Sequence, residues 1–152
     1  MNVGNCCSKQ VVKASAATSL REASLLMRNH HVGTLVVVAT ERGIERPIGI
    51  ITDRDIVIAV LAPGARPEAI RAGDAMPGQL FTVREDAGVF EAFRQMAEHG
   101  VRRLPVVRAD GGLAGIVTAD DLLRVVAAEL GSFATALRRG GEREIAARPP
   151  LR

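Results

Sequence analysis

VFEAFRQMAEHGVRRLPVV, the sequence of residues 89–107, repeats LREASLLMRNHHVGTLVVV, the sequence of residues 20–38. The two segments are offset by 69 residues and are identical at eight positions. Downstream, GIVTADDLL at 115–123 matches GIITDRDIV at 49–57, and the offset falls to 66. The three-residue difference lies in the loop between the matched segments, where a repeat tolerates insertions. The chain is therefore a tandem repeat of one structural unit.

Each copy has the sequence pattern of three short strands and two helices. Apolar residues at helical spacing, such as Leu20, Ala23 and Met27, predict an amphipathic helix. Apolar runs joined by a Gly-containing turn predict a hairpin. The unit is thus β-α-β-β-α, and we expect an α+β fold with two repeats packed pseudo-symmetrically around short sheets. The first copy is expected to have strands at 11–12, 35–38 and 48–51, a helix from 20, and a second helix that starts after Thr52 and runs on the apolar residues of 56–61. The second copy is expected to have strands at 80–83, 104–107 and 115–117, a helix from 89, and a second helix that starts after Thr118 and runs on the apolar residues of 122–130.

The repeat also sets the expected domain boundaries. We expect repeat 1 over residues 5–62, a linker over 63–78, repeat 2 over 79–131, and an Arg-rich, partly disordered tail over 132–152. The linker is rich in Pro and Gly and has room for one short helix at Glu68–Asp74. The net charge of +3 resides in the last fifteen residues, which hold five Arg and two Glu.

The composition disfavours several classes of function. The chain has no Trp or Tyr and only four Phe, so its core is expected to be aliphatic and base-stacking nucleic-acid surfaces are disfavoured. No apolar run approaches the ~18 residues of a membrane helix, and the first residues do not resemble a signal peptide, so we expect a cytoplasmic protein. The adjacent Cys6 and Cys7 and the three histidines lack the spacing of a zinc site, so we expect no metal.

Two features resemble the cystathionine-β-synthase-type (CBS) domain pair, or Bateman module. These are VRRLPVV at 101–107 and the Gly-x-x-Thr-x-x-Asp segments that begin at Gly49 and Gly115. The likeness covers roughly residues 5–130 and is closest to small stand-alone bacterial CBS-pair proteins. It implies a non-catalytic regulatory module that requires no cofactor and binds an adenine nucleotide (AMP, ADP, ATP or NAD) or S-adenosylmethionine between its repeats. It also implies a homodimer that acts in signal transduction on another protein.

The resemblance further implies which residues bind the ligand. The two Asp side chains of the Thr–Asp segments would take the ribose hydroxyls, and the two Thr hydroxyls would lie near ribose or phosphate. The opposite repeat would lend backbone to the base, and Arg103 would meet phosphate. The implied ligand-binding residues are Thr52, Arg54, Asp55, Thr118 and Asp121 in the Thr–Asp segments, and Val32, Gly33, Thr34, Val101, Arg102 and Arg103 in the segments opposite them.

General chemistry supports these assignments independently of the resemblance. One carboxylate can accept hydrogen bonds from both hydroxyls of a vicinal diol. Thr52 and Thr118 precede expected helices, whose free amides and dipoles attract phosphate, and Arg offers a planar fork for phosphate oxygens. Because repeat 1 has Thr34 where repeat 2 has Arg103, we expect the cleft with Thr118, Asp121 and Arg103 to hold phosphate better. In the other cleft, Arg54 or His31 could substitute.

Other interpretations of the same residues remain open. The Thr-x-x-Asp segments are also plain helix caps, and Arg54, Arg102 and Arg103 could be solvated surface charges. The chain could be a structural dimerisation module without a physiological ligand. A nucleic-acid binder acting through the Arg-rich tail would show steep salt dependence. No nucleophile–base set appears in the sequence, so we expect no enzymatic activity.

Overall fold

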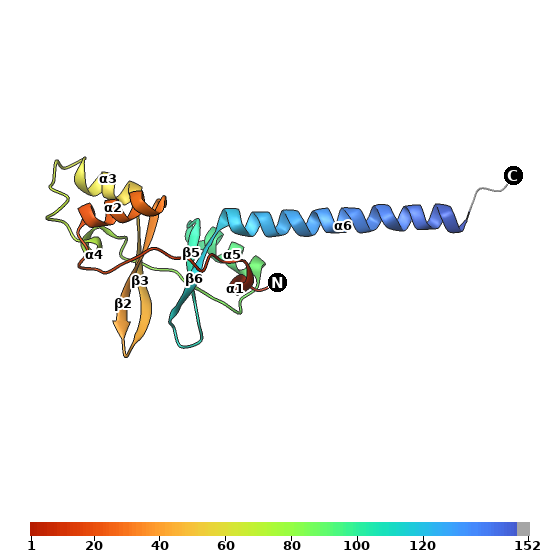
Figure 1. The fold of residues 1–152 in the computed structure, drawn as a ribbon, viewed down its shortest axis with the longest axis horizontal. Helices are drawn as coiled ribbons and strands as arrows, with labels where there is room; N and C mark the ends of the chain where they lie inside the picture. Colours follow the sequence, from red (N-terminus) through yellow and green to blue (C-terminus); the bar gives the residue numbers. More distant parts are fainter. Residues whose placement is uncertain (149–152) are drawn as a thin grey trace.

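The fold consists of two similar lobes joined side by side, with one long helix projecting from the second lobe (Figure 1). The computed structural model describes residues 1–148. Its α+β architecture, with two three-stranded sheets, confirms the predicted fold class. Lobe 1 contains β1 (Lys13–Ala14), α2 (Leu20–His30), β2 (Thr34–Glu41), β3 (Ile44–Thr52) and α3 (Asp53–Val60), and lobe 2 contains β4 (Val83–Arg84), α5 (Val89–His99), β5 (Arg103–Val107), β6 (Leu113–Thr118) and α6 (Ala119–Ala147).

The two sheets have the same topology and the same irregularity. In each sheet the short first strand runs parallel to the central strand, and the central strand pairs antiparallel with the third. A β-bulge follows Val37 in lobe 1 and Val106 in lobe 2, and these residues lie 69 positions apart. The repeat in the sequence is therefore a repeat in backbone geometry down to the bulge.

Each lobe has its own aliphatic core. Leu20, Leu35 and Ile51 are fully buried in lobe 1, and Leu104 and Leu122 are fully buried in lobe 2. The helices meet the sheets through the apolar positions that the sequence places at helical spacing. The expectation of an aliphatic core is confirmed.

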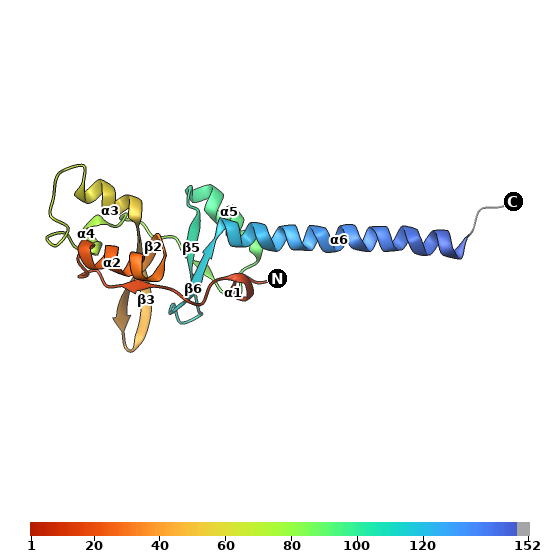
Figure 2. The same ribbon diagram turned by 45° about the horizontal axis from the view of Figure 1, so that its top comes forward.

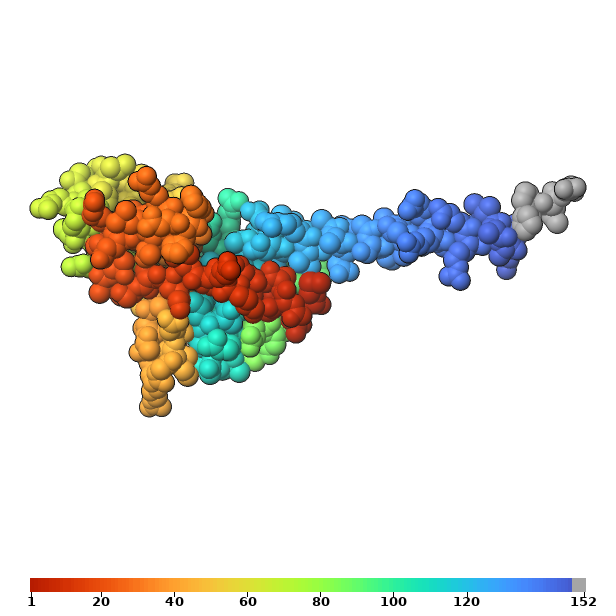
Figure 3. Space-filling model, viewed as in Figure 1, coloured from red at the N-terminus to blue at the C-terminus, as the bar shows by residue number. Residues whose placement is uncertain are grey.

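Two short helices are exchanged between the lobes, which changes the predicted domain boundaries. Helix α1 (Val3–Cys6) precedes lobe 1 in sequence but packs on lobe 2, where Val3 is fully buried. Helix α4 (Ala72–Ala75) precedes lobe 2 but packs on lobe 1, where Ala72 is fully buried. Val3 N donates to Ala87 O at 2.9 Å, and Ala72 N donates to Thr18 O at 2.8 Å. Residues that were predicted as linker or as part of repeat 1 therefore complete the opposite lobe (Figure 3).

The signal for this exchange is a pair of glycines 69 residues apart, Gly4 and Gly73. A Cβ atom on Gly4 would lie 2.8 Å from the carbonyl oxygen of Glu85, and one on Gly73 would lie 3.1 Å from that of Ala16. Small residues are therefore needed where each short helix approaches the other lobe. The predicted linker helix at Glu68–Asp74 is displaced, because the helical turn lies where it can reach the core of lobe 1.

Helix α6 is much longer than the sequence analysis predicted. The second helix of repeat 2 was expected to end near Leu130, before a partly disordered tail, whereas residues 132–147 continue the helix (Figure 2). Its Ala, Leu, Arg and Glu residues are strong helix formers, and the prediction of a tail from the Arg-rich composition and the terminal Pro-Pro gave them too little weight. The last four residues of the predicted tail lie outside the described residues. Among residues 1–148, no helix is long and apolar enough to cross a membrane.

Candidate functional site

The two Thr–Asp segments form matching capping boxes at the starts of α3 and α6. The Thr52 amide and hydroxyl both donate to Asp55 Oδ2 at 2.8 Å. The Thr118 amide and hydroxyl donate to Asp121 Oδ2 at 3.0 and 2.7 Å. In return, each Thr hydroxyl accepts the Asp backbone N–H at 3.2 Å. The helix-cap interpretation of these residues is thus correct, and it leaves a role in binding open.

The carboxylates differ in what remains for a ligand. Within residues 1–148, Asp55 Oδ1 has no hydrogen-bond or ion-pair partner, so the capping box uses only one of the two carboxylate oxygens. Asp121 Oδ1 lies 3.8 Å from an Arg124 guanidinium nitrogen. A carboxylate oxygen without a protein partner can accept hydrogen bonds from hydroxyl groups of a ligand. By this criterion Asp55 is the better prepared of the two.

The first cleft lies between the lobes and has a volume of about 530 Å³. Lobe 1 contributes Thr52, Arg54 and Asp55, together with Ile50 at the end of β3. A cavity of this size falls in the range of small-molecule sites. The opposite wall comes from the residues before β4 and from the turn that enters β5, and it is formed by Pro77, Gln79, Leu80, Phe81, Gly100, Val101, Arg102 and Arg103.

An aromatic pair stiffens one wall of the first cleft. The rings of Phe81 and His99 stack with centroids 3.8 Å apart and planes 9° from parallel. His99 is the last residue of α5, and Gly100 in the left-handed conformation ends that helix. In lobe 1 the matching left-handed residue is His31, which lines neither inter-lobe cleft. His31 therefore does not take the phosphate-binding place that the sequence analysis allowed it.

The second cleft is the pseudo-symmetric counterpart of the first and is smaller, at about 280 Å³. It brings Thr118 together with Val32, Gly33 and Thr34, as the sequence analysis expected. Asp121 is not among the residues that line it. Its remaining wall is formed by Ser8, Gln10, Val11, Val12, Val36, Arg103 and Ile116.

One polar group in the second cleft has no protein partner. The Thr34 hydroxyl oxygen is buried, and within residues 1–148 it makes no hydrogen bond. Buried hydroxyls are normally hydrogen-bonded, so this unpaired oxygen is an exception within a residue that lines the cleft. Thr34 is the first residue of β2, so its side chain lies at the end of the sheet.

The sequence analysis did not foresee that the segments 8–12 and 77–81, which lie outside the named helices and strands, line the clefts. Val11 and Val12 were expected to form the first strand, but β1 lies two residues later. Their apolar character reflects the lining of the second cleft. The signal was present, because Gln10 and Gln79 are identical and lie 69 residues apart, each followed by two apolar residues.

The first cleft is lined by more arginines than the second. Arg54, Arg102 and Arg103 all line the first cleft, and of these three Arg103 alone also lines the second. In the other repeat, the residue that matches Arg54 is Asp120 and the residue that matches Arg102 is Gly33, so neither arginine has a counterpart. An anionic group is therefore favoured in the first cleft, where guanidinium groups can form charge-assisted hydrogen bonds to it.

The N-terminal segment places a thiol close to the second Thr–Asp segment. Ser8 pairs with Ile116 on the edge of β6, with Ser8 N donating at 2.9 Å. The pKa of the Cys6 thiol is raised, first by burial and then by electrostatic repulsion from its neighbours, which include Asp121. A raised thiol pKa lowers the fraction of reactive thiolate at neutral pH. Among residues 1–148, no three His, Cys, Asp or Glu side chains are grouped to hold a metal ion.

A sequence profile of the CBS domain matches this chain twice, over residues 3–62 and 72–128. Both matches begin at the exchanged short helices, at Val3 and at Ala72. The profile boundaries therefore follow the structural repeat, including the segments that the sequence analysis assigned to the linker.

Several known proteins resemble this chain. The protein MK0525 of Methanopyrus kandleri is 40% identical over 125 residues, which is 82% of this chain and 62% of that protein. The chain thus spans less than two thirds of that relative's length. Hypoxic response protein 1 of Mycobacterium tuberculosis is 38% identical over 106 residues, or 70% of this chain and 71% of that protein.

Solved structures share the fold. Hypoxic Response Protein I, crystallised with two coordinated zinc ions, superposes with a TM-score of 0.71 and 33% identity over 82% of this chain and 98% of that one. The CBS domain pair of MJ0100, in complex with 5′-methylthioadenosine and S-adenosyl-L-methionine, has a TM-score of 0.69 and 28% identity. That alignment covers 85% of this chain and 98% of the MJ0100 chain.

Proposed function

The chain belongs to the CBS domain family, and from this membership we propose that it is a non-catalytic regulatory module that binds a phosphate-bearing adenine nucleotide between its repeats. The candidate ligands are AMP, ADP, ATP and NAD. The related pair of MJ0100 holds two adenosine compounds, which supports an adenosine-type ligand here. The proposal assigns no chemical step to the protein, because its role is to sense the ligand.

The observation that carries the proposal is the composition of the first cleft. Thr52 and Asp55 stand on one wall, and Arg102 and Arg103 stand on the other. The free Oδ1 atom of Asp55 suits the ribose hydroxyls, the aliphatic and Phe81 surfaces suit a base, and the arginines suit phosphate. Each part of an adenine nucleotide thus has a chemical counterpart in one cavity of about 530 Å³.

The arrangement of charge supports a different preference between the clefts from the one expected from the sequence. The sequence analysis assigned the better phosphate site to Thr118 and Asp121 with Arg103. We propose instead that the Thr52 cleft takes the phosphate-bearing ligand, because Arg54, Arg102 and Arg103 meet there. The segment 101–103 lines the first cleft opposite Thr52 and Asp55, and only Arg103 of this segment also lines the second cleft beside Thr118. The smaller Thr118 cleft is better matched to an adenosine compound without phosphate.

The position of the first cleft explains how binding would regulate. Its two walls belong to different lobes, so a ligand that contacts both stabilises one relative placement of the lobes. The signal then passes to whatever contacts the outer surfaces. We propose a homodimer as the basic assembly and a separate protein as the regulated partner. The exposed side chains Val57, Ile58 and Leu61 at the end of α3 offer an apolar surface to that regulated partner.

Isothermal titration of the full chain with AMP and with adenosine tests the proposal. AMP is expected to bind more tightly than adenosine, because only AMP presents phosphate to the arginines. Arg103→Gln is expected to weaken AMP binding by about tenfold, which corresponds to the loss of one charge-assisted hydrogen bond. Asp55→Asn is expected to weaken both ligands, because the ribose contact is common to them.

Arg28→Gln is the matched control, since Arg28 is exposed at the end of α2 and lies outside both clefts. It is expected to bind AMP as the natural chain does. If neither AMP, ADP, ATP, NAD nor S-adenosylmethionine binds, the chain is a structural dimerisation module instead. Equal affinity for AMP and adenosine would remove the phosphate assignment while leaving the adenosine site.

A further inference from the structure

The projecting helix α6 carries an apolar stripe that the rest of residues 1–148 leaves largely uncovered. Leu123, Leu130, Phe133 and Leu137 are 56%, 64%, 64% and 63% exposed. With Val126 and Gly140 they follow spacings of three and four residues over residues 123–140. This is the a/d pattern of a coiled coil. The pattern runs from the part of α6 that packs on lobe 2 into the part that projects beyond it (Figures 1 and 2).

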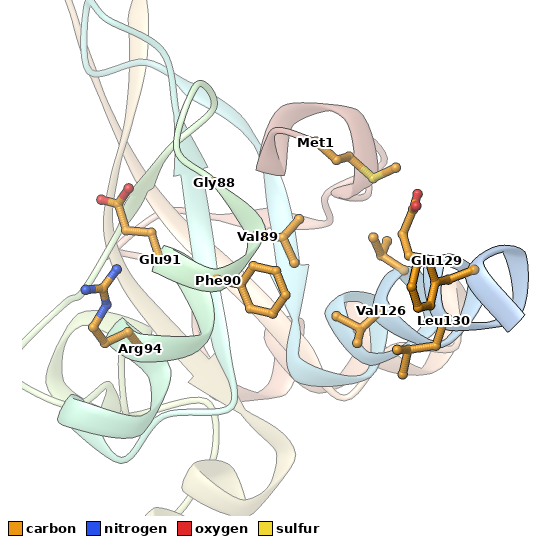
Figure 4. A pocket seen from close by; sticks show the side chains of 11 residues that line it. Met1, Gly88, Val89, Phe90, Glu91, Arg94, Val126, Glu129 and Leu130 are labelled. Carbon is orange, nitrogen blue, oxygen red and sulfur yellow. The ribbon is translucent and has the colours of Figure 1, made fainter. Parts of the chain in front are cut away.

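The near half of the stripe lines a large groove on the surface of lobe 2. This groove, of about 800 Å³, lies between α5 and α6 (Figure 4). Val126, Leu130 and Phe133 line it from α6, Phe90 lines it from α5, and Met1 closes one end. Phe90 is 72% exposed, so an aromatic surface faces the groove without a partner. An apolar groove continuous with an a/d stripe is suited to a second helix.

The far half of α6, after Phe133, projects from lobe 2 without packing against another element of residues 1–148. About fourteen residues follow Phe133 in the helix, and they include Gly140 and Gly141. Isolated helices of about that length are marginal in water, and glycine weakens them further. This segment therefore gains stability if its apolar side chains pack against another surface.

The charges of α6 indicate what that surface is. Residues 119–133 carry three acidic side chains and one arginine, for a net charge of −2. Residues 134–148 carry four arginines and two glutamates, for a net charge of +2. A parallel pair of α6 helices would place like charges together, whereas an antiparallel pair places each acidic half against a basic half. The antiparallel pair also sets opposite ends of the two helix dipoles side by side.

From these observations we infer that α6 pairs antiparallel with α6 of a second copy, whose projecting half lies in the groove between α5 and α6. A register that keeps the stripe in contact sets Leu130 opposite Phe133 of the second copy, and Val126 opposite its Leu137. Leu123 then faces the second copy's Gly140, where the small residue leaves room for it. The inference refines the homodimer proposed above, since it names the surface and the orientation, and it does not depend on nucleotide binding.

Light scattering after size-exclusion chromatography tests the surface with the full chain. The natural chain is expected to be a dimer at tens of micromolar, and Leu137→Glu is expected to weaken dimerisation at least tenfold. Thr135→Glu adds the same charge two residues earlier, on the side of α6 away from the stripe, and is expected to remain dimeric. Circular dichroism of both variants checks that the fold is kept, and the AMP titration is repeated on Leu137→Glu. A dimer equally stable in Leu137→Glu would overturn the inference while leaving the proposed homodimer and ligand intact.

Spin labels at residue 142 test the orientation, in a Glu142→Cys chain with Cys6 and Cys7 replaced by serine. In the antiparallel register the two copies of residue 142 are offset by 21 residues, or about 30 Å along the axis. In a parallel pair they would be about 10 Å apart, the distance between packed helix axes. A distance distribution centred near the shorter value, or a monomeric natural chain, would refute the antiparallel pair.

Discussion

The exchanged helix α1 can be tested by shortening one buried side chain, in the variant Val3→Ala. Val3 is fully buried in the core of lobe 2, although it lies before lobe 1 in sequence. The change removes two methyl groups, worth about 1.6 kcal/mol in transfer free energy. A residual cavity of a few tens of Å³ adds about 1 kcal/mol. We therefore expect the free energy of unfolding to fall by about 2.5 kcal/mol, and Tm to fall by about 5–10 °C for a chain of this size.

Urea unfolding followed by circular dichroism measures this loss, with Val57→Ala as the matched control. Val57 is 51% exposed on α3, so the same truncation there removes little burial. The higher helix propensity of alanine offsets part of that small loss, and we expect a change within about 0.5 kcal/mol. Hydrogen exchange identifies the lobe that is destabilised, because in Val3→Ala the amides of β4–β6 should exchange faster than those of β1–β3. A Val3→Ala chain as stable as the control would refute the packing of α1 on lobe 2.

Three further predictions concern local geometry. Thr118→Ala removes the hydroxyl that caps α6 and is expected to lower the free energy of unfolding by about 1 kcal/mol with or without nucleotide, as urea titration would show; no loss would argue against the cap. The hydrogen bonds from Ser19 lower the pKa of Glu22. The ionised carboxylate therefore stabilises the fold at pH values above the unfolded-state pKa of 4.5, and this stabilisation is lost as the pH falls through the lower folded-state pKa. An NMR titration should place the Glu22 pKa below 4.5 and nearer to it in Ser19→Ala, and unchanged values in both would contradict the capping box. Gly115→Ala would bring a Cβ to 2.6 Å from the backbone oxygen of Ser8, so it is expected to displace the N-terminal segment and lower stability by about 1–3 kcal/mol, whereas a neutral result would mean that this segment does not pair with β6.

The sequence by itself determined the repeat, the class of fold and most of the candidate site. Helical spacing and apolar runs are local properties, so they placed the hairpin of each unit and the starts of its helices within a few residues of the structure, although not the end of α6. The residues of the first cleft that were expected to bind ligand, from Thr52 to Arg103, line one cavity. The identity of the two Thr–Asp segments also predicted both capping boxes.

Only the tertiary structure decided which lobe each short helix completes, because α1 and α4 are each placed by contacts with residues distant in sequence. Only the structure showed that Val11 and Val12 line a cavity, because an apolar residue in the sequence is equally compatible with a strand, a core or the wall of a cleft. The grouping of Arg54 with Arg102 and Arg103 depends on how the two lobes face each other, which no local pattern records. The same holds for the apolar stripe of α6. Its spacing can be seen in the sequence, but its exposure depends on which parts of lobe 2 pack against the helix.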